Sequence, residues 1–79
     1  MTHTEPPADD VLDIAHARLM CQRGVARALR VGAGLRLSDI ARAVNVSEAS
    51  VSRWETKKRG PSNPEVAVAL GRLYRKLAQ

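Results

Sequence analysis

The chain has 79 residues, enough for one small domain and too few for two. It is 44% hydrophobic but has no Phe, one Trp and one Tyr, so its core must be built from Ala, Val, Leu and Ile, which suits close-packed helices. The composition excludes an internal disulfide, because there is one cysteine, and a membrane span, because no apolar run is long enough. With no signal-peptide pattern at the start, a cytoplasmic protein is expected.

The charge is uneven along the chain. The formal net charge is +5, yet residues 1–15 contain four acids and no Lys or Arg, while residues 53–79 contain seven bases and two acids. The later part is therefore more basic than the whole chain, and its densest cluster is Lys57-Lys58-Arg59. This distribution favours a polyanionic partner, although a basic run alone is more often a solvated loop.

The first predicted element follows a proline-containing segment, residues 1–8, that we expect to be a disordered arm. A helix is predicted over about 10–21. Its apolar residues at helical spacing form one face: Val11, Leu12, Ala15 and Leu19. Three acids precede or occupy the first turn: Asp9, Asp10 and Asp13. We expect them to cap the free N–H groups of the helix. The alternative, an inhibitory segment that competes for the basic face, is less favoured.

The remaining helices are predicted from apolar spacing and stop signals. A second helix over about 22–32 is either separated from the first at Gly24 or continuous with it, and two glycines end it. A third covers 37–44, and the last opens with Asn63 as N-cap and Pro64 at its first position. The buried stripe predicted for the last helix is Val66, Leu70, Leu73 and Leu77. Because no strand pattern occurs, we expect an all-α bundle of about five short helices, with residues 9–79 as one domain.

Residues 37–56 contain the residue types that a helix-turn-helix requires. Ala41 is small enough for a second helix to cross closely, and Asn45 tolerates the left-handed turn between the helices. Ser47 is suited to cap the second helix. The apolar anchors before and after the turn have the required spacing: Ile40, Val44, Val46, Val51 and Trp54.

With these residues in place, the segment from Gly24 to Leu73 resembles the Cro and phage-repressor (Xre-like) helix-turn-helix family. Ser52-Arg53-Trp54-Glu55 matches the family's Ser-x-Trp-Glu signature. Two positions depart from it: Asn45 replaces the usual turn glycine, and Arg36 stands where a capping Ser or Thr is usual, with Ser38 as a weaker substitute. The resemblance implies a lambda-repressor-like domain that binds double-stranded DNA.

The resemblance also implies residue roles, with the helix over 47–56 in the major groove. By its chemistry, Arg53 is the best candidate for a bidentate hydrogen bond to guanine. The implied base-reading residues are Glu48, Ala49, Ser50 and Arg53. The implied phosphate-binding residues are Arg36, Ser47, Lys57, Lys58 and Arg59. Arg30 and Glu55 are implied to be a structural pair that bridges the first core helix to the end of the recognition helix.

The leading hypothesis is a sequence-specific transcriptional regulator, a phage-type repressor or Cro-like protein, nucleoid-associated and encoded by a bacterium or phage. The alternatives are an antitoxin-like or excision-factor protein that binds DNA and a partner protein, or an adaptor for protein contact alone. We expect a homodimer, which forms either through exposed parts of the flanking helices or only on DNA. A monomer is the alternative. The candidate dimer residues are Leu12, Leu19, Leu73, Tyr74 and Leu77.

No cofactor, metal, small molecule or membrane partner is predicted. His3, His16 and Cys21 lack the spacing of a metal site, and no nucleophile–base arrangement occurs, so an enzyme is not expected. Cys21 and Trp54 are both predicted to be core residues.

Overall fold

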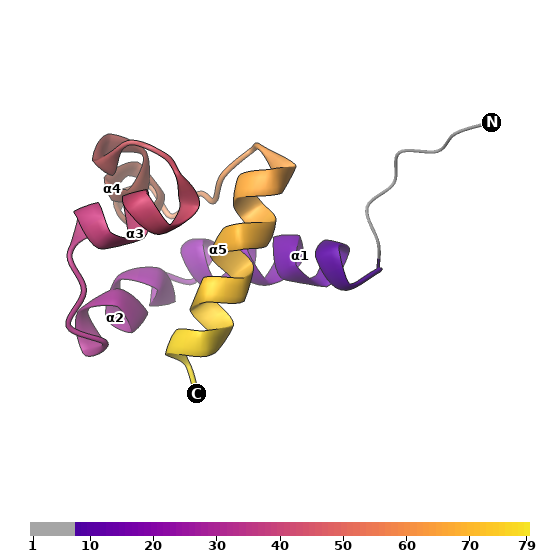
Figure 1. Cartoon of the computed structure of the whole chain (residues 1–79), viewed down its shortest axis with the longest axis horizontal. Helices are drawn as coiled ribbons and strands as arrows, with labels where there is room; N and C mark the ends of the chain where they lie inside the picture. Colours follow the sequence, from indigo (N-terminus) through magenta and orange to yellow (C-terminus); the bar gives the residue numbers. More distant parts are fainter. Residues whose placement is uncertain (1–7) are drawn as a thin grey trace.

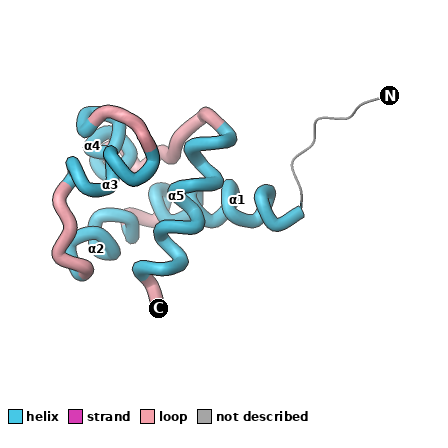
Figure 2. Tube along the Cα trace, in the orientation of Figure 1, coloured by secondary structure: helices cyan, strands magenta, loops and turns pink. Residues whose placement is uncertain are grey.

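A computed structural model of the protein describes residues 8–79, and this part of the chain forms five α-helices and no strand (Figure 1; Figure 2). In chain order the helices are α1 (Ala8–Gln22), α2 (Val25–Gly32), α3 (Leu37–Val44), α4 (Glu48–Thr56) and α5 (Pro64–Leu77). The predicted all-α fold is therefore confirmed. Residues 1–7 of the predicted arm lie outside the described residues, and residue 8 is the first residue of α1.

A turn at Gly24 separates α1 from α2. Gly24 has a φ of 73°, the left-handed region that glycine adopts without steric penalty. Its N–H donates to the carbonyl of Cys21 at 3.1 Å, which closes the end of α1. The alternative of one continuous helix is therefore wrong, and α2 leaves the turn in a new direction (Figure 1).

Helices α1 and α5 cross at a glycine and form the most extensive helix pair of the fold (Figure 1). A Cβ placed on Gly71 would lie 2.7 Å from the carbonyl carbon of Asp13 and still closer to its oxygen. No side chain fits at this position, because the backbone of α1 occupies the space that it would need. In the sequence, the only sign of this crossing is a glycine inside a helix.

Asp13 links these two helices, and the capping role predicted for it is wrong. Because α1 begins at Ala8, Asp13 lies in the second turn, beyond the free N–H groups of the first. Its buried carboxylate accepts from Arg72 Nε at 3.1 Å and lies 3.2 Å from Arg75 Nη1. Asp10 also pairs with Arg72, at 2.8 Å. The acids of α1 therefore hold α5, while the side chain of Asp9 lies outside the described part of the chain.

The face of α1 that packs on α5 is not the predicted apolar face. Asp13, Ala17 and Cys21 are buried, whereas the predicted stripe is exposed: Val11, Leu12, Ala15 and Leu19. The close approach at Gly71 explains the difference, because only small or short side chains fit between helices at that separation. Three large apolar residues of α1, Val11, Leu12 and Leu19, consequently face outward, whereas Met20 packs partly against the core.

The core is mainly aliphatic, and both aromatic residues of the chain, Trp54 and Tyr74, are part of it. Its buried residues are Ala17, Cys21, Ala26, Ile40, Ala41, Val44, Val51, Trp54, Leu70 and Tyr74. On α5 the stripe is rotated from the prediction, because Ala67 and Tyr74 are buried while Val66, Leu73 and Leu77 are only half-buried. Tyr74 is therefore a core residue and does not offer the exposed surface expected of a dimer residue.

Cys21 and Trp54 are buried, as predicted. Burial raises the pKa of the Cys21 thiol to about 11, so the thiol is protonated at neutral pH and behaves as a core group. No helix among residues 8–79 has the length and apolarity needed to cross a membrane.

Candidate nucleic-acid interface

Helices α3 and α4 form the predicted motif. Asn45 adopts the left-handed conformation between them, with a φ of 59°, and the next N–H, of Val46, returns to the carbonyl of Ala41 at 2.9 Å. Ile40, Ala41 and Val44 are buried on α3, and Val51 and Trp54 are buried on α4. The anchors predicted from spacing thus point inward, which leaves the opposite side of α4 free.

The start of α4 is capped as predicted. Ser47 Oγ accepts the backbone N–H of Ser50 at 3.2 Å and lies 3.0 Å from the Ser50 hydroxyl. Glu48 occupies the first turn and, like Ala49, is exposed, while Ser50 is half-buried. Arg53 follows one turn after Ala49 and is exposed. The four predicted base-reading residues therefore all lie on α4, with Glu48 as the acid at its leading end.

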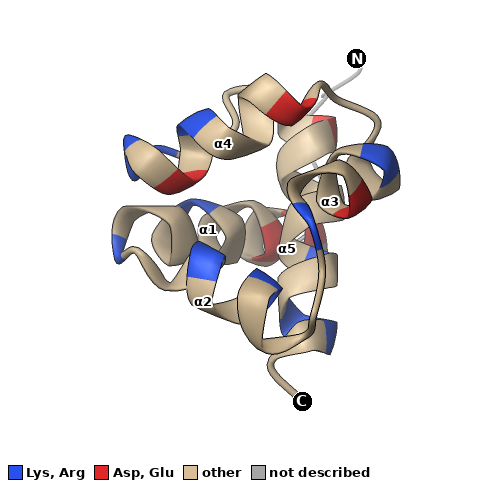
Figure 3. Ribbon diagram, turned by 90° about the vertical axis from the view of Figure 1, so that its left-hand side faces the viewer, with Lys and Arg blue, Asp and Glu red and all other residues tan. Residues whose placement is uncertain are grey.

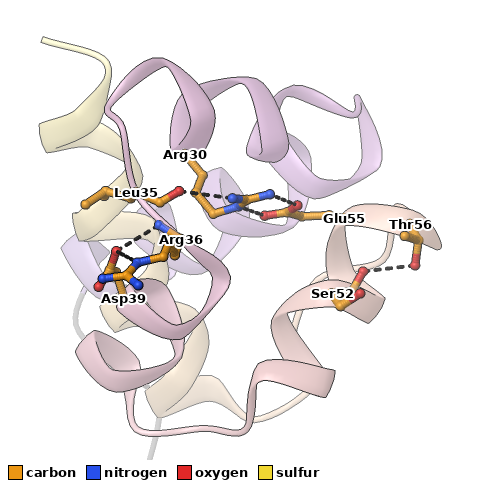
Figure 4. Close-up of polar contacts among 7 residues, drawn as sticks. All are labelled: Arg30, Leu35, Arg36, Asp39, Ser52, Glu55 and Thr56. Atoms are coloured by element: carbon orange, nitrogen blue, oxygen red, sulfur yellow. Dashed lines mark hydrogen bonds and ion pairs between the residues drawn. The ribbon is translucent and has the colours of Figure 1, made fainter.

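The start of α3 is capped by a residue that was not predicted from the sequence. The backbone N–H of Arg36 donates to Asp39 Oδ2 at 2.8 Å (Figure 4). Ser38, the predicted substitute, does not supply the cap of α3 in the described structure. An arginine side chain has no acceptor atom and cannot replace Ser or Thr as a cap. Asp39 instead supplies the carboxylate half of a capping box. The Arg36 side chain is exposed beside α3.

Arg30 of α2 and Glu55 near the end of α4 form a bidentate ion pair (Figure 4). Arg30 Nε and Nη2 donate to the two carboxylate oxygens at 2.7 and 2.9 Å, and Nη1 donates to the carbonyl of Leu35 at 3.0 Å. Only 12% of the Arg30 side chain and 5% of the Glu55 side chain are exposed. The hydrogen bond to Glu55 raises the pKa of Arg30 above its ordinary value. One side chain thus joins α2, the segment before α3 and the end of α4.

The basic residues Lys57, Lys58 and Arg59 follow α4 directly. Lys57 and Arg59 line a cavity of about 420 Å³ together with Arg53 and Trp54. Lys58 is in the left-handed region, with a φ of 54°, and its side chain lies against Gly24 at the α1–α2 turn. Figure 3 shows basic residues at the end of α4 and at this neighbouring turn. The three cations are thus placed differently, although they are consecutive in the sequence.

Helix α1 supports the basic loop through Arg18, which was not predicted to take part in the site. Arg18 Nε donates to the carbonyl of Pro61 at 3.3 Å, and Nη2 donates to that of Ser62 at 3.4 Å. A Cβ on Gly60 would lie 3.0 Å from the Arg18 Cα, so the loop backbone lies directly on α1. No local pattern connects residues so distant in the sequence, and only the folded chain brings them together.

This geometry agrees with comparison to known proteins. Residues 24–76 match the family described as "Helix-turn-helix domain". The chain belongs to the helix-turn-helix domain family. No curated protein and no solved structure matches it. The helix-turn-helix match begins at Gly24, in the turn before α2, so α1 lies outside the matched residues. In the helix-turn-helix region, α3 and α4 are the paired helices, and α4 is the second of the two.

Proposed function

We propose that this protein is a sequence-specific double-stranded DNA-binding transcriptional regulator of the phage-repressor or Cro-like (Xre-like) kind, with α4 in the major groove. One observation carries the proposal: a capped second motif helix presents an unburied face directly beside a basic loop. Membership of the helix-turn-helix domain family supports DNA as the partner. A nucleoid-associated location in the cytoplasm of a bacterium, or of a phage's host, follows from this role.

In this proposal the exposed side chains divide into two groups. Residues at the start and middle of α4 contact base edges: Glu48, Ala49, Ser50 and Arg53. Residues around them hold phosphates and set the depth of the helix: Arg36, Ser47, Lys57, Lys58 and Arg59. Arg53 donates to guanine, and Glu48 either accepts from cytosine N4 or repels other bases. The Arg30–Glu55 pair fixes the end of α4 from below and does not contact DNA.

Binding to DNA together with a second protein, as in an antitoxin or excision factor, is the runner-up. It would need an additional exposed surface, and the outer face of α1 is such a surface. An adaptor for protein contact alone is less well supported, because the outer face of α4 carries Arg53 and adjoins three consecutive cations. The exposed outer face of α1 is also compatible with the leading proposal if the protein binds DNA as a homodimer.

Arg53→Ala should relax sequence preference at one base position. We expect a loss of about 1–3 kcal/mol on the preferred sequence, since a bidentate contact to guanine is lost, and little loss on random DNA. Titration of both DNAs measures the difference. Arg27→Ala removes the same charge from an exposed position of α2 and serves as the matched control. Equal losses on both DNAs would remove Arg53 from the base-reading group.

Lys57→Ala should weaken binding to all sequences alike. Lys57 lines the same cavity as Arg53, so we expect its loss to remove one phosphate contact. The plot of log K against log salt should then become less steep by about one unit. Lys58→Ala should change the slope less, because the Lys58 side chain lies against Gly24. Salt titrations of the two variants and the wild type test this order. A larger change of the salt slope for Lys58→Ala than for Lys57→Ala would show that Lys58, and not Lys57, is the stronger phosphate contact.

A further inference from the structure

A hollow of about 260 Å³ lies between the second half of α1 and the loop that follows α4. It is lined by two residues of α1 and four of the loop: Arg18, Gln22, Arg59, Gly60, Pro61 and Ser62. Residues 16–29 and 56–64, from which this lining comes, contain three Lys or Arg each and no Asp or Glu. The electrostatic potential in the hollow is therefore positive, which favours an anion.

Arg18 is held in the wall of this hollow by the loop itself. Its hydrogen bonds to the carbonyls of Pro61 and Ser62 use two of the five N–H groups of a guanidinium, so others remain for an acceptor. The guanidinium also covers the negative ends of both carbonyls, which would otherwise repel an anion. Because Arg18 is half-buried and already positioned, it loses little side-chain entropy when it binds a ligand.

The donors that line the hollow fit a phosphate group. Arg18 and Arg59 bring two guanidinium groups from different elements, and a guanidinium can hold phosphate oxygens in bidentate fashion. The Gln22 amide and the Ser62 hydroxyl add neutral donors. Among the described residues that line the hollow, only Pro61 is apolar, so an uncharged organic ligand is not favoured.

The position of the hollow beside α4 indicates the source of that phosphate. Arg59, Gly60 and Ser62 also line the cavity that contains Arg53 and Lys57, so the two hollows share one wall. Lys and Arg positions on α1, on α2 and at the end of α4 lie on one face of the molecule (Figure 3). A DNA backbone that passes the end of α4 therefore continues into the hollow against α1.

We propose that this hollow is a DNA phosphate site, in which Arg18 and Arg59 bind one backbone phosphate beyond the bases that α4 contacts. The inference rests on the proposed function and extends it to α1, which lies outside the residues that match the helix-turn-helix domain family. Arg18 thus holds the loop and contacts the phosphate at the same time. The contact adds affinity without reading sequence.

Binding to DNA in which single phosphates are replaced by neutral methylphosphonates tests this proposal, with the full chain and its preferred sequence. On unmodified DNA, Arg18→Gln should lower the affinity by roughly fivefold to tenfold at about 0.1 M salt, the size of one phosphate contact. Neutralising the phosphate in the hollow should cost the wild type the same factor and cost Arg18→Gln almost nothing. Such coupling between one side chain and one phosphate does not arise if Arg18 only supports the fold.

Two further variants separate charge from loop support. Lys76→Gln removes one positive charge from an exposed position near the end of α5 and should leave the affinity for every DNA in the scan nearly unchanged. Arg18→Lys keeps a cation in the hollow and should retain most of the coupling. Equal losses for Arg18→Lys and Arg18→Gln would show that the loop hydrogen bonds matter and the charge does not, which would overturn the phosphate site.

Two other results would also overturn the inference. A wild type that binds DNA but shows no phosphate coupled to Arg18 would remove the site and leave the proposed function intact, whereas a wild type that binds no DNA would end both. Inorganic phosphate titrated into the protein without DNA should bind far more weakly than DNA. Saturation at micromolar phosphate would assign the hollow to a free phosphate instead of the DNA backbone.

Discussion

Replacing Gly71 by alanine should destabilise the protein by about 3 kcal/mol, a large part of the stability of a domain this small. The new Cβ would meet the backbone of Asp13, with its carbonyl carbon at 2.7 Å, and backbone atoms cannot rotate away as a side chain can. Relief requires α1 and α5 to move apart, which weakens the Asp13 ion pairs and loosens the core around Tyr74. The gain in helix propensity, about 1 kcal/mol, is too small to offset this.

Gly32→Ala is the matched control for this prediction. Gly32 is the last residue of α2 and does not adopt a positive φ, and a Cβ at this position would have no neighbouring atom within 4 Å. The same chemical change should therefore be neutral or stabilise the fold by up to about 1 kcal/mol. Urea denaturation followed by circular dichroism measures both variants. A Gly71→Ala protein as stable as the wild type would contradict the close crossing of α1 and α5.

Removing Glu55 should have the second largest effect on stability. Glu55→Ala leaves Arg30 charged and largely buried without its carboxylate, and a group in this state costs more than the pair contributes. We expect the free energy of unfolding to fall by about 3 kcal/mol, the low end of the range for buried pairs. The loss is at the low end because Arg30 keeps its hydrogen bond to the Leu35 carbonyl and its side chain is slightly exposed to water. The end of α4 should loosen with it.

Glu48→Ala provides the comparison, because it removes the same side chain from an exposed position of the same helix. Glu48→Ala should lower the free energy of unfolding by less than about 1 kcal/mol, the size of a helix-dipole interaction at the surface. A double-mutant cycle with Arg30→Ala isolates the coupling between the partners. If Glu55→Ala and Glu48→Ala were equally mild, the ion pair would not hold α4.

Features set by neighbouring residues could be predicted from the sequence. Asn45 in the left-handed turn, Ser47 as the cap of α4 and Asn63 as the cap of α5 each depend on a few local atoms. The inward anchors of α3 and α4 follow from spacing on a single helix. These local rules were enough to place the helix-turn-helix and to identify the exposed side of its second helix.

Features set by tertiary packing could not be predicted in this way. Apolar spacing on α1 identified a real stripe, but which face is buried depends on the close approach of Gly71 from α5. Asp13 looked like a cap because its partners, Arg72 and Arg75, are far away in the sequence. Arg18 was missed for the same reason. At the interface, the left-handed Lys58 differs from its neighbours through backbone geometry that residue type does not reveal.

Selection of bound sequences from a random pool of double-stranded DNA tests the central claim, sequence-specific binding through α4, most directly. We predict enrichment of one motif that contains a guanine, and loss of preference for that guanine when Arg53→Ala is selected in parallel. If the protein binds as a dimer, the motif should be palindromic, with half-sites about 34 Å apart. A pool that shows no enrichment after selection, with all sequences bound equally, would contradict the claim.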